Sequence, residues 1–367
     1  MSDDDGLMRP FIIDAGQHKF RFGFQGEVPT DCRHAAAICP SSKNEFDYPF
    51  EVYNVSSEVR AQMRTVTPFV NGVVVDWEAA NFLISEVVKT RAQDAPILFC
   101  LPVQMTEPSD LDQLASILYA TGAASVAFAY APALAALSCG ITKCCVLHLG
   151  ESESYAACVV DGKLDRASVT FSGVGGADLT LQANLSVGAT ATPFQQRFLE
   201  QLDVSNRPME GARLVKEKIE YVCSDESTLC LDSSGGQQFL EHLFVPVVPE
   251  KVGLATLVLS SLQNASGNGV QRVVLEGAGA NIAMQTGGLW PRLQQELGAG
   301  EEWELVGGLD GIHLASTAVW RGGSMLTEHR NFSTFSLDAH AYQEGGEVMH
   351  YVLTPSKLFQ EFCIGII

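Results

Sequence analysis

Residues 11–16 read Phe-Ile-Ile-Asp-Ala-Gly, an apolar run that ends at an aspartate and a glycine. Residues 146–150, Val-Leu-His-Leu-Gly, show a similar pattern near the middle of the chain. Short apolar runs that stop at turn residues are typical of buried strands. Two strand–turn segments of this kind can face each other and bind a polyphosphate through backbone N–H groups. The pattern therefore predicts α/β units on either side of a phosphate-binding cleft.

The composition indicates a globular protein rather than a disordered one. Hydrophobic residues make up 46% of the 367 residues and charged residues 18%, values that suit a folded protein. A chain of this length exceeds the usual size of a single core, so we expect two lobes. The formal net charge of −20 repels phosphate backbones and argues against direct nucleic-acid binding. Other proteins, particularly ones with basic surfaces, are the expected partners.

The cysteines and the N-terminal segment bear on the compartment. Ten cysteines are present without a C-x-x-C array, and Cys100, Cys144, Cys145 and Cys158 lie inside apolar runs. We expect them to be buried, reduced thiols, as in a cytosolic protein. The acidic segment 1–6 does not resemble a signal peptide. The apolar stretches are too short or too interrupted to span a bilayer, so no membrane partner is expected.

Strands and helices alternate along most of the chain. Asp76 is suited to cap a helix that runs to about residue 90, and Asp161-Gly162 is a turn signal between strands. The predicted strands cover residues 11–13, 20–24, 96–101, 126–129, 144–149, 155–160 and 273–275. The other predicted helices cover residues 109–121, 132–138, 177–185, 212–221 and 291–297. We expect Gly140 to cap the C-terminus of the helix at 132–138.

Six short motifs occur in the order that is familiar from one protein family. They are Asp14-Ala15-Gly16, Gly72 to Trp77, Met105-Thr106-Glu107, Gly176 to Thr180, Val215 to Val222, and Val319 to Ser324. Together they resemble the actin family, within the larger class of sugar kinases and heat-shock chaperone ATPases. The resemblance implies an actin-like ATPase-domain fold of class α/β, with two related lobes around a central cleft.

The resemblance also implies a division of the chain. Residues 8–137 plus 314–367 correspond to the first lobe, with a short inserted subdomain at about 32–68. Residues 138–313 correspond to the second lobe, with a reduced inserted subdomain at about 178–255.

In the first phosphate loop, the resemblance assigns Asp14 to a metal-bound water and Gly16 to the close approach of backbone to phosphate. Gln17 stands where the family has a small serine, but it can still donate a hydrogen bond. His18 stands where glycine is usual, so a positive φ there would strain the backbone. Arg21 replaces a phosphate-contacting lysine and remains a suitable phosphate partner. The alternatives are a strand-end turn former for Asp14 and an ordinary surface charge for Arg21.

The second phosphate loop departs further from the family pattern Asp-Ser-Gly-Asp-Gly. His148 replaces the aspartate that orders the metal's water, and Ser152 replaces the second glycine. Gly150 is retained, and Glu151 keeps a carboxylate that is longer by one methylene. We expect His148 to be a hydrogen-bonded core residue rather than a metal ligand.

Two further groups that position the attacking water are replaced. The water-positioning glutamine aligns with Ala131, and the nearby catalytic-site histidine aligns with Tyr155. Phosphoryl transfer depends on positioning and charge stabilisation. We therefore expect no efficient ATP hydrolysis and assign no catalytic or metal-ligating residue.

The purine side of the implied nucleotide site is better preserved. Lys216 and Glu217 stand at the adenosine position, with Gly175 and Gly176 opposite and Gly277 on the third wall. A solvated helix face is the alternative for the Lys-Glu pair. ATP or ADP is the implied cofactor, and a magnesium requirement is left open.

Two shortened segments bear on assembly. Residues 40–52 correspond to a shorter form of actin's mobile loop, and residues 231–254 are also shortened. Both changes remove surface through which one subunit would contact the next along a filament, so no homopolymer is expected.

We therefore expect a non-catalytic actin-related protein, a structural subunit of a cytoskeletal or other multiprotein assembly in the cytoplasm. Its degenerate and shortened loops resemble those of the pointed-end actin-related subunit of dynactin. A chromatin-remodelling subunit in the nucleus, a cilium- or cytoskeleton-specific relative, and an active ATPase or sugar-kinase-like enzyme remain alternatives.

Overall fold

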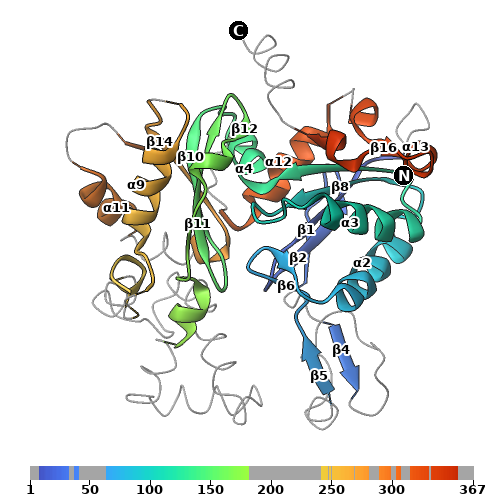
Figure 1. Ribbon diagram of the computed structural model, residues 1–367, viewed down its shortest axis with the longest axis horizontal. Helices are drawn as coiled ribbons and strands as arrows, with labels where there is room; N and C mark the ends of the chain where they lie inside the picture. The colour runs from blue at the N-terminus through green and yellow to red at the C-terminus, as the bar shows by residue number, and fades with distance from the viewer. Residues whose placement is uncertain are drawn as a thin grey trace.

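The structure is a computed structural model that describes residues 8–32, 37–40, 63–181, 241–246, 248, 250–267, 269–280, 289–298, 303–306, 315–329 and 332–353. These residues form two larger sheets that lie side by side, each with helices packed against it (Figure 1). The predicted two-lobed α/β fold is confirmed.

The first sheet has the strand order β16-β9-β8-β1-β2-β3, and β17 pairs with β9. Its central strands β1, β8 and β9 are parallel, whereas β1 and β2 form the predicted antiparallel hairpin. The strands are β1 (Phe11–Ala15), β2 (Phe20–Phe24), β3 (Thr30–Cys32), β8 (Pro96–Leu101), β9 (Ser125–Tyr130), β16 (Leu337–Asp338) and β17 (Val352–Leu353).

Both faces of the first sheet are buried, which explains its nearly continuous apolar runs. Phe11 and Ile13 belong to the core shared with α2 (Trp77–Arg91) and α3 (Pro108–Ala120), whereas Ile12 belongs to the core on the opposite face. The predicted cap is confirmed, because the Ala79 N–H donates to the Asp76 carboxylate at 2.9 Å.

The second sheet has the strand order β12-β11-β10-β14-β15, and β13 pairs with β11. Asp161 and Gly162 have φ values of 51° and 73° at the tight turn before β12, so the predicted turn is confirmed. Helices α9 (Leu254–Asn264) and α11 (Leu289–Leu297) pack against this sheet. Its strands are β10 (Cys144–Leu149), β11 (Ser154–Val160), β12 (Lys163–Leu164), β13 (Thr170–Ser172), β14 (Arg272–Glu276) and β15 (Glu304–Val306).

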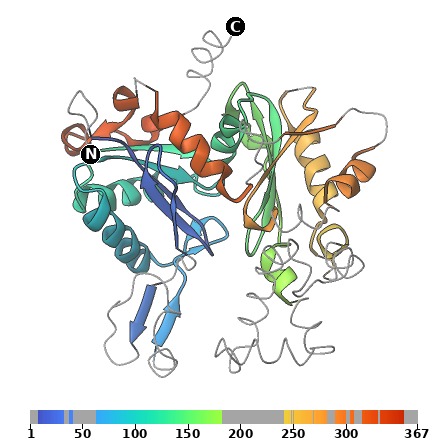
Figure 2. The same ribbon diagram turned by 180° about the vertical axis from the view of Figure 1, so that it is seen from behind.

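Two helices connect the lobes. All eight residues of α4 (Ala131–Ser138) are buried, because one face packs on the first sheet and the other on the second. Helix α12 (Ala318–Thr327) packs beside α4, and Figure 2 shows it, in orange-red, running from the first sheet toward the second. Gly140 follows α4 with a φ of 69°, as expected for a glycine that ends a helix.

Shorter elements complete the described chain. Residues 176–181 begin a helix, and Figure 1 shows the β4–β5 hairpin projecting from the first lobe. The remaining elements are β4 (Ala37–Pro40), β5 (Met63–Val66), β6 (Phe69–Val70), β7 (Val73–Val74), α13 (Ala339–Gln343), and the 3₁₀ turns η2 (Arg166–Ser168), η3 (Ala315–Thr317), η4 (Phe332–Phe335) and η5 (Val348–Tyr351).

Several sequence predictions concern parts of the chain that the structure does not cover. The predicted helix at 212–221 and most of the inserted subdomain at 178–255 lie outside the described residues, and the domain boundaries stay predictions. The four cysteines singled out above are free and buried, as predicted. None of the described helices combines the length and apolar character needed to cross a lipid bilayer.

Candidate functional site

A cavity of about 170 Å³ lies where loops of the two lobes meet. The β1–β2 loop and the β10–β11 turn contribute to its wall, together with the start of the helix at 176–181 and the segment after β14. Eight of the predicted nucleotide-binding residues line it: Asp14, Gly16, Gln17, Arg21, Gly150, Glu151, Gly176 and Gly277. Gly175 is not among the lining residues, although the next residue, Gly176, is. Lys216 and Glu217 lie outside the described residues.

Gly277 allows the strand ends of the second lobe to approach closely. Its φ is +94°, and a Cβ atom there would lie 2.3 Å from the Leu149 carbonyl oxygen. Only glycine combines this backbone conformation with so short an approach. The residue therefore has a structural reason to be glycine, independent of any ligand.

Asp14 is paired with Arg21 on the neighbouring strand. The two residues are register partners of the β1–β2 hairpin, and Arg21 Nη1 lies 3.1 Å from Asp14 Oδ2. Burial raises the pKa of Asp14 above its usual value, although the charge of Arg21 opposes that shift. Arg21 is itself only 7% exposed, so it is a buried partner of Asp14 rather than an ordinary surface charge.

His148, Glu276 and Tyr155 form a second polar group across β14, β10 and β11. His148 is the register partner of both other residues. The His148 Nδ1 atom lies 3.0 Å from Glu276 Oε1, and the Tyr155 hydroxyl donates to Glu276 Oε2 at 2.8 Å. The rings of His148 and Tyr155 stack with centroids 4.5 Å apart. The expected hydrogen bond of His148 is present, and the ring also lines the cavity.

The charged groups around His148 shift the pKa of its imidazole ring. Burial lowers the pKa of His148, but the carboxylates of Glu276, Glu153 and Asp14 raise it, and the net shift is upward. Asp14 comes from the first lobe and the two glutamates from the second. Carboxylates from both lobes therefore stabilise the protonated form of His148.

Glu276 is the main residue of the site that sequence reasoning missed. The signal was available, because Glu276 ends an apolar strand immediately before Gly277, as Asp14 ends one shortly before Gly16. The strand pairing of β14 with β10 then places Glu276 beside His148.

The backbone N–H groups of the glycines assigned to the nucleotide site already donate to acceptors within the protein. The bonds are Gly16 N to Lys19 O (3.0 Å), Gly150 N to Glu153 O (3.1 Å), Gly175 N to Asp178 Oδ2 (2.9 Å), Gly176 N to Gly150 O (2.8 Å) and Gly277 N to Ala315 O (3.1 Å). His18 does not adopt a positive φ, so the loop avoids the strain that a glycine-like conformation would bring there.

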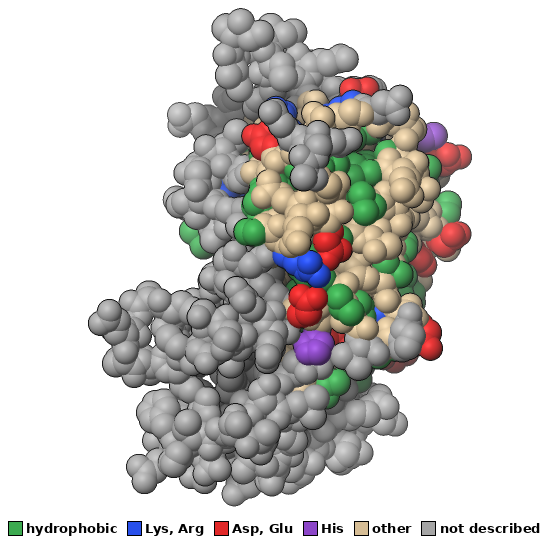
Figure 3. Space-filling model, turned by 90° about the vertical axis from the view of Figure 1, so that its left-hand side faces the viewer, with side chains coloured by type: hydrophobic (Ala, Val, Ile, Leu, Met, Phe, Trp, Pro, Cys, Tyr) green, Lys and Arg blue, Asp and Glu red, His purple; other side chains and the backbone are tan. Residues whose placement is uncertain are grey.

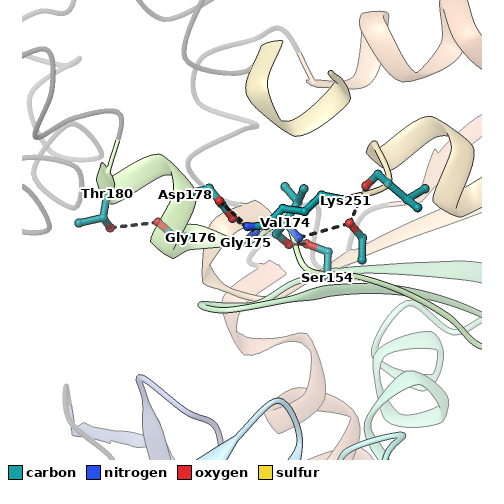
Figure 4. Close-up of polar contacts among 9 residues, drawn as sticks. Ser154, Val174, Gly175, Gly176, Asp178, Thr180 and Lys251 are labelled. Carbon is teal, nitrogen blue, oxygen red and sulfur yellow. Dashed lines mark hydrogen bonds and ion pairs between the residues drawn. The ribbon is translucent and has the colours of Figure 1, made fainter. Parts of the chain in front are cut away.

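Side chains of the helix at 176–181 and of neighbouring segments hold the start of this helix, as Figure 4 shows. Asp178 accepts the Gly175 N–H through one carboxylate oxygen and pairs with Lys251 at 2.5 Å through the other. Ser154 Oγ donates to the Val174 carbonyl at 2.7 Å. Asp178 thus has a local capping role in the motif that resembles Gly-x-Asp-Leu-Thr.

The groups that would contact a magnesium–polyphosphate group have partners within the protein in this arrangement. The loop N–H groups described above are used within the protein, and Asp14 and Glu276 are paired with Arg21 and His148. Among the described residues, no group of three or more His, Cys, Asp or Glu side chains is placed to hold a metal ion. Binding of ATP or ADP stays a prediction that depends on the adenosine side of the site.

Figure 3 shows the outer side of the second lobe. Its described charged side chains lie singly or in mixed pairs and not in one basic patch. Arg272 and Glu304 of the second lobe form an exposed ion pair, with Nε and Oε2 3.0 Å apart.

Comparison with known proteins gives a consistent set of similarities. The family model described as "Actin" matches residues 7–223. The chain is 25% identical to centractin of Saccharomyces cerevisiae over 241 residues, which covers 61% of this chain and 59% of centractin. It is 24% identical to actin-like protein 9 of Rattus norvegicus, covering 92% and 87% of the two chains. Its identity to actin-like protein 7B of Homo sapiens is 22%, covering 94% and 88%.

Proposed function

The chain belongs to the actin family, and from that premise we propose that it is a non-catalytic actin-related protein that serves as a structural subunit of a multiprotein assembly. The observation that carries the proposal is the pairing of cavity side chains with one another. Asp14 binds Arg21, and His148 and Tyr155 bind Glu276. Groups engaged in this way do not position a metal-bound water for attack on a phosphate.

The cytoplasm and the cytoskeleton are the proposed setting, and other proteins are the proposed partners. The similarity to centractin and to actin-like proteins supports this proposal. Purification of the tagged full-length chain from its native source, followed by identification of co-purifying proteins, tests it. Recovery of the chain in a stoichiometric complex is the expected result, and recovery only as an isolated protein would count against a subunit role.

We predict no magnesium-dependent ATPase activity above the background of a heat-inactivated sample. The reason is that Ala131 has no polar side chain to orient water and that the nearby polar groups are paired. Phosphate release from ATP with magnesium, with and without added sugars, measures this. Turnover that disappears in Asp14→Ala would overturn the non-catalytic assignment, and sugar-dependent turnover would favour a sugar-kinase-like enzyme.

We predict that the protein remains monomeric at micromolar concentration in polymerising salt. The shortened segments at 40–52 and 231–254 would reduce the surface available for head-to-tail contacts that extend a filament. These segments lie largely outside the described residues, so the prediction rests on the sequence. Sedimentation and electron microscopy measure it. Long homopolymers would contradict it, whereas binding to one end of a related filament would support terminal placement.

A further inference from the structure

The β10–β11 turn contacts three segments of the first lobe. The Ser152 hydroxyl hydrogen-bonds with the side-chain amides of Gln17 and Asn71, donating to one oxygen at a time. Gln104 Nε2 donates to the Glu153 carboxylate. Gln17 follows β1, Asn71 lies between β6 and β7, and Gln104 follows β8. One turn of the second lobe is therefore bound by three separate loops of the first.

The first-lobe loops also bind each other around this turn. The Asn71 N–H lies 3.4 Å from Gln17 Oε1, so Gln17 and Asn71 form one surface opposite Ser152. Gln104 lies against Gly72, where an added Cβ would come within 2.0 Å of the Gln104 side-chain oxygen. The turn between β6 and β7 thus holds two of the three contacting amides in position.

A further contact joins the lobes away from the cavity. Arg166 of η2 donates from Nη2 to the Tyr130 hydroxyl, and its guanidinium lies 4.5 Å from the centroid of the Tyr130 ring. The Tyr130 hydroxyl in turn donates to the Met105 carbonyl at 3.3 Å. The two lobes are therefore bridged by protein side chains at the cavity and at a second place.

Two of the side chains that bridge the lobes, Gln17 and Ser152, stand at positions where the phosphate loops depart from the resembled motif. Gln17 stands where the resembled motif has a small serine, and Ser152 stands where it has a glycine. A glycine at 152 has no side chain to reach Gln17, so the contact requires the residue present here. The two residues that depart from the motif, Gln17 and Ser152, thus form a hydrogen bond with each other.

We propose that Gln17, Asn71 and Gln104 with Ser152 and Glu153 form an interlobe clasp that keeps the cleft closed in the absence of nucleotide and metal. The clasp occupies the facing loops with protein–protein hydrogen bonds, and the glycine N–H groups around it are likewise satisfied within the protein. Closure of the cleft is then a property of the chain itself. This inference goes beyond the proposed function, because it concerns the state of the cleft and not the assembly that the protein joins.

Hydrogen exchange on the full-length protein, after treatment with apyrase and EDTA, tests the clasp. In the wild type we expect exchange at residues 16–19 to be the same with EDTA and with added magnesium and ATP. In Ser152→Gly we expect exchange at these residues, on the opposite lobe, to be about 3- to 10-fold faster, which corresponds to the loss of one neutral hydrogen bond. Gln17→Ser should accelerate exchange at residues 150–153 in the same way.

Gln93→Ser is the matched control, because Gln93 is exposed in a turn of the first lobe and should leave both loops unchanged. The double variant Gln17→Ser/Ser152→Gly should exchange no faster than the more affected single variant, since both changes remove the same contact between Gln17 and Ser152. The clasp would be overturned if the loops of the wild-type protein exchanged at least about tenfold faster after nucleotide removal. It would also be overturned if the effects of Gln17→Ser and Ser152→Gly on exchange were fully additive in the double variant. Measured ATP turnover would overturn the proposed non-catalytic function, but it would not change the conclusion that the exchange rates give about the clasp.

Discussion

Gly322→Ala is expected to destabilise the protein by about 2–4 kcal/mol, through overpacking between α12 and α4. A Cβ atom on Gly322 would lie 1.9 Å from the carbonyl oxygen of Leu134 and 2.8 Å from its Cα. These are backbone atoms of α4, so the neighbour cannot yield by rotating a side chain. The two helices must separate, and α4 packs against both sheets. The gain in helix propensity of about 1 kcal/mol offsets only part of this cost.

The adjacent glycine provides a matched control. A Cβ atom on Gly323 would meet Ile12 Cγ2 at 3.2 Å and Leu98 Cδ2 at 3.4 Å, both in side chains. The same gain in helix propensity then opposes a mild crowding, so Gly323→Ala should stay within about 1 kcal/mol of the wild type. Urea unfolding of the two variants measures the difference, and equal stabilities would contradict the close packing of α12 on α4.

Glu276→Ala is expected to cost about 2–4 kcal/mol of stability, because it leaves the buried Tyr155 and the partly buried His148 without their acceptor. Tyr155 loses the oxygen that its hydroxyl contacts at 2.8 Å, and His148 loses the carboxylate beside Nδ1. Glu304→Ala on the neighbouring strand is the control, since Glu304 and Arg272 are both more than half exposed. Exposed pairs contribute about 0–1 kcal/mol, so the two glutamate variants should differ clearly in urea unfolding.

The pH dependence of Glu276→Ala gives a second measurement. The folded-state pKa of His148 is raised above 6.5, so its stabilisation is fully present below that value and is lost as pH rises through the folded pKa. Removing Glu276 removes much of the stabilisation that protonated His148 contributes. The stability difference between wild type and variant should therefore be larger at about pH 6 than at about pH 9. A difference that grows with pH would contradict the ion pair of His148 and Glu276.

The local elements of this protein follow from its sequence. The alternation of apolar and turn residues predicts the β1–β2 hairpin, and a carboxylate before an amphipathic stretch predicts the Asp76 cap. Asp161-Gly162 predicts a turn because both residues tolerate a positive φ. The pairing of Asp14 with Arg21 is a consequence of the same hairpin, since its register places the two residues opposite each other.

The site depended on contacts that no local pattern encodes. Glu276 lies beside His148 only because β14 pairs in parallel with β10, 128 residues away in the chain. Ser152 reaches Gln17 and Asn71 only because two lobes close on each other. Propensities and turn signals act between neighbours in sequence, whereas the choice of paired strands is set by burying both faces of each sheet. The sequence by itself therefore determined the strand–turn elements and the polar residues at their ends. The tertiary structure decided which of those residues bind one another, and hence that the cleft side chains are paired within the protein.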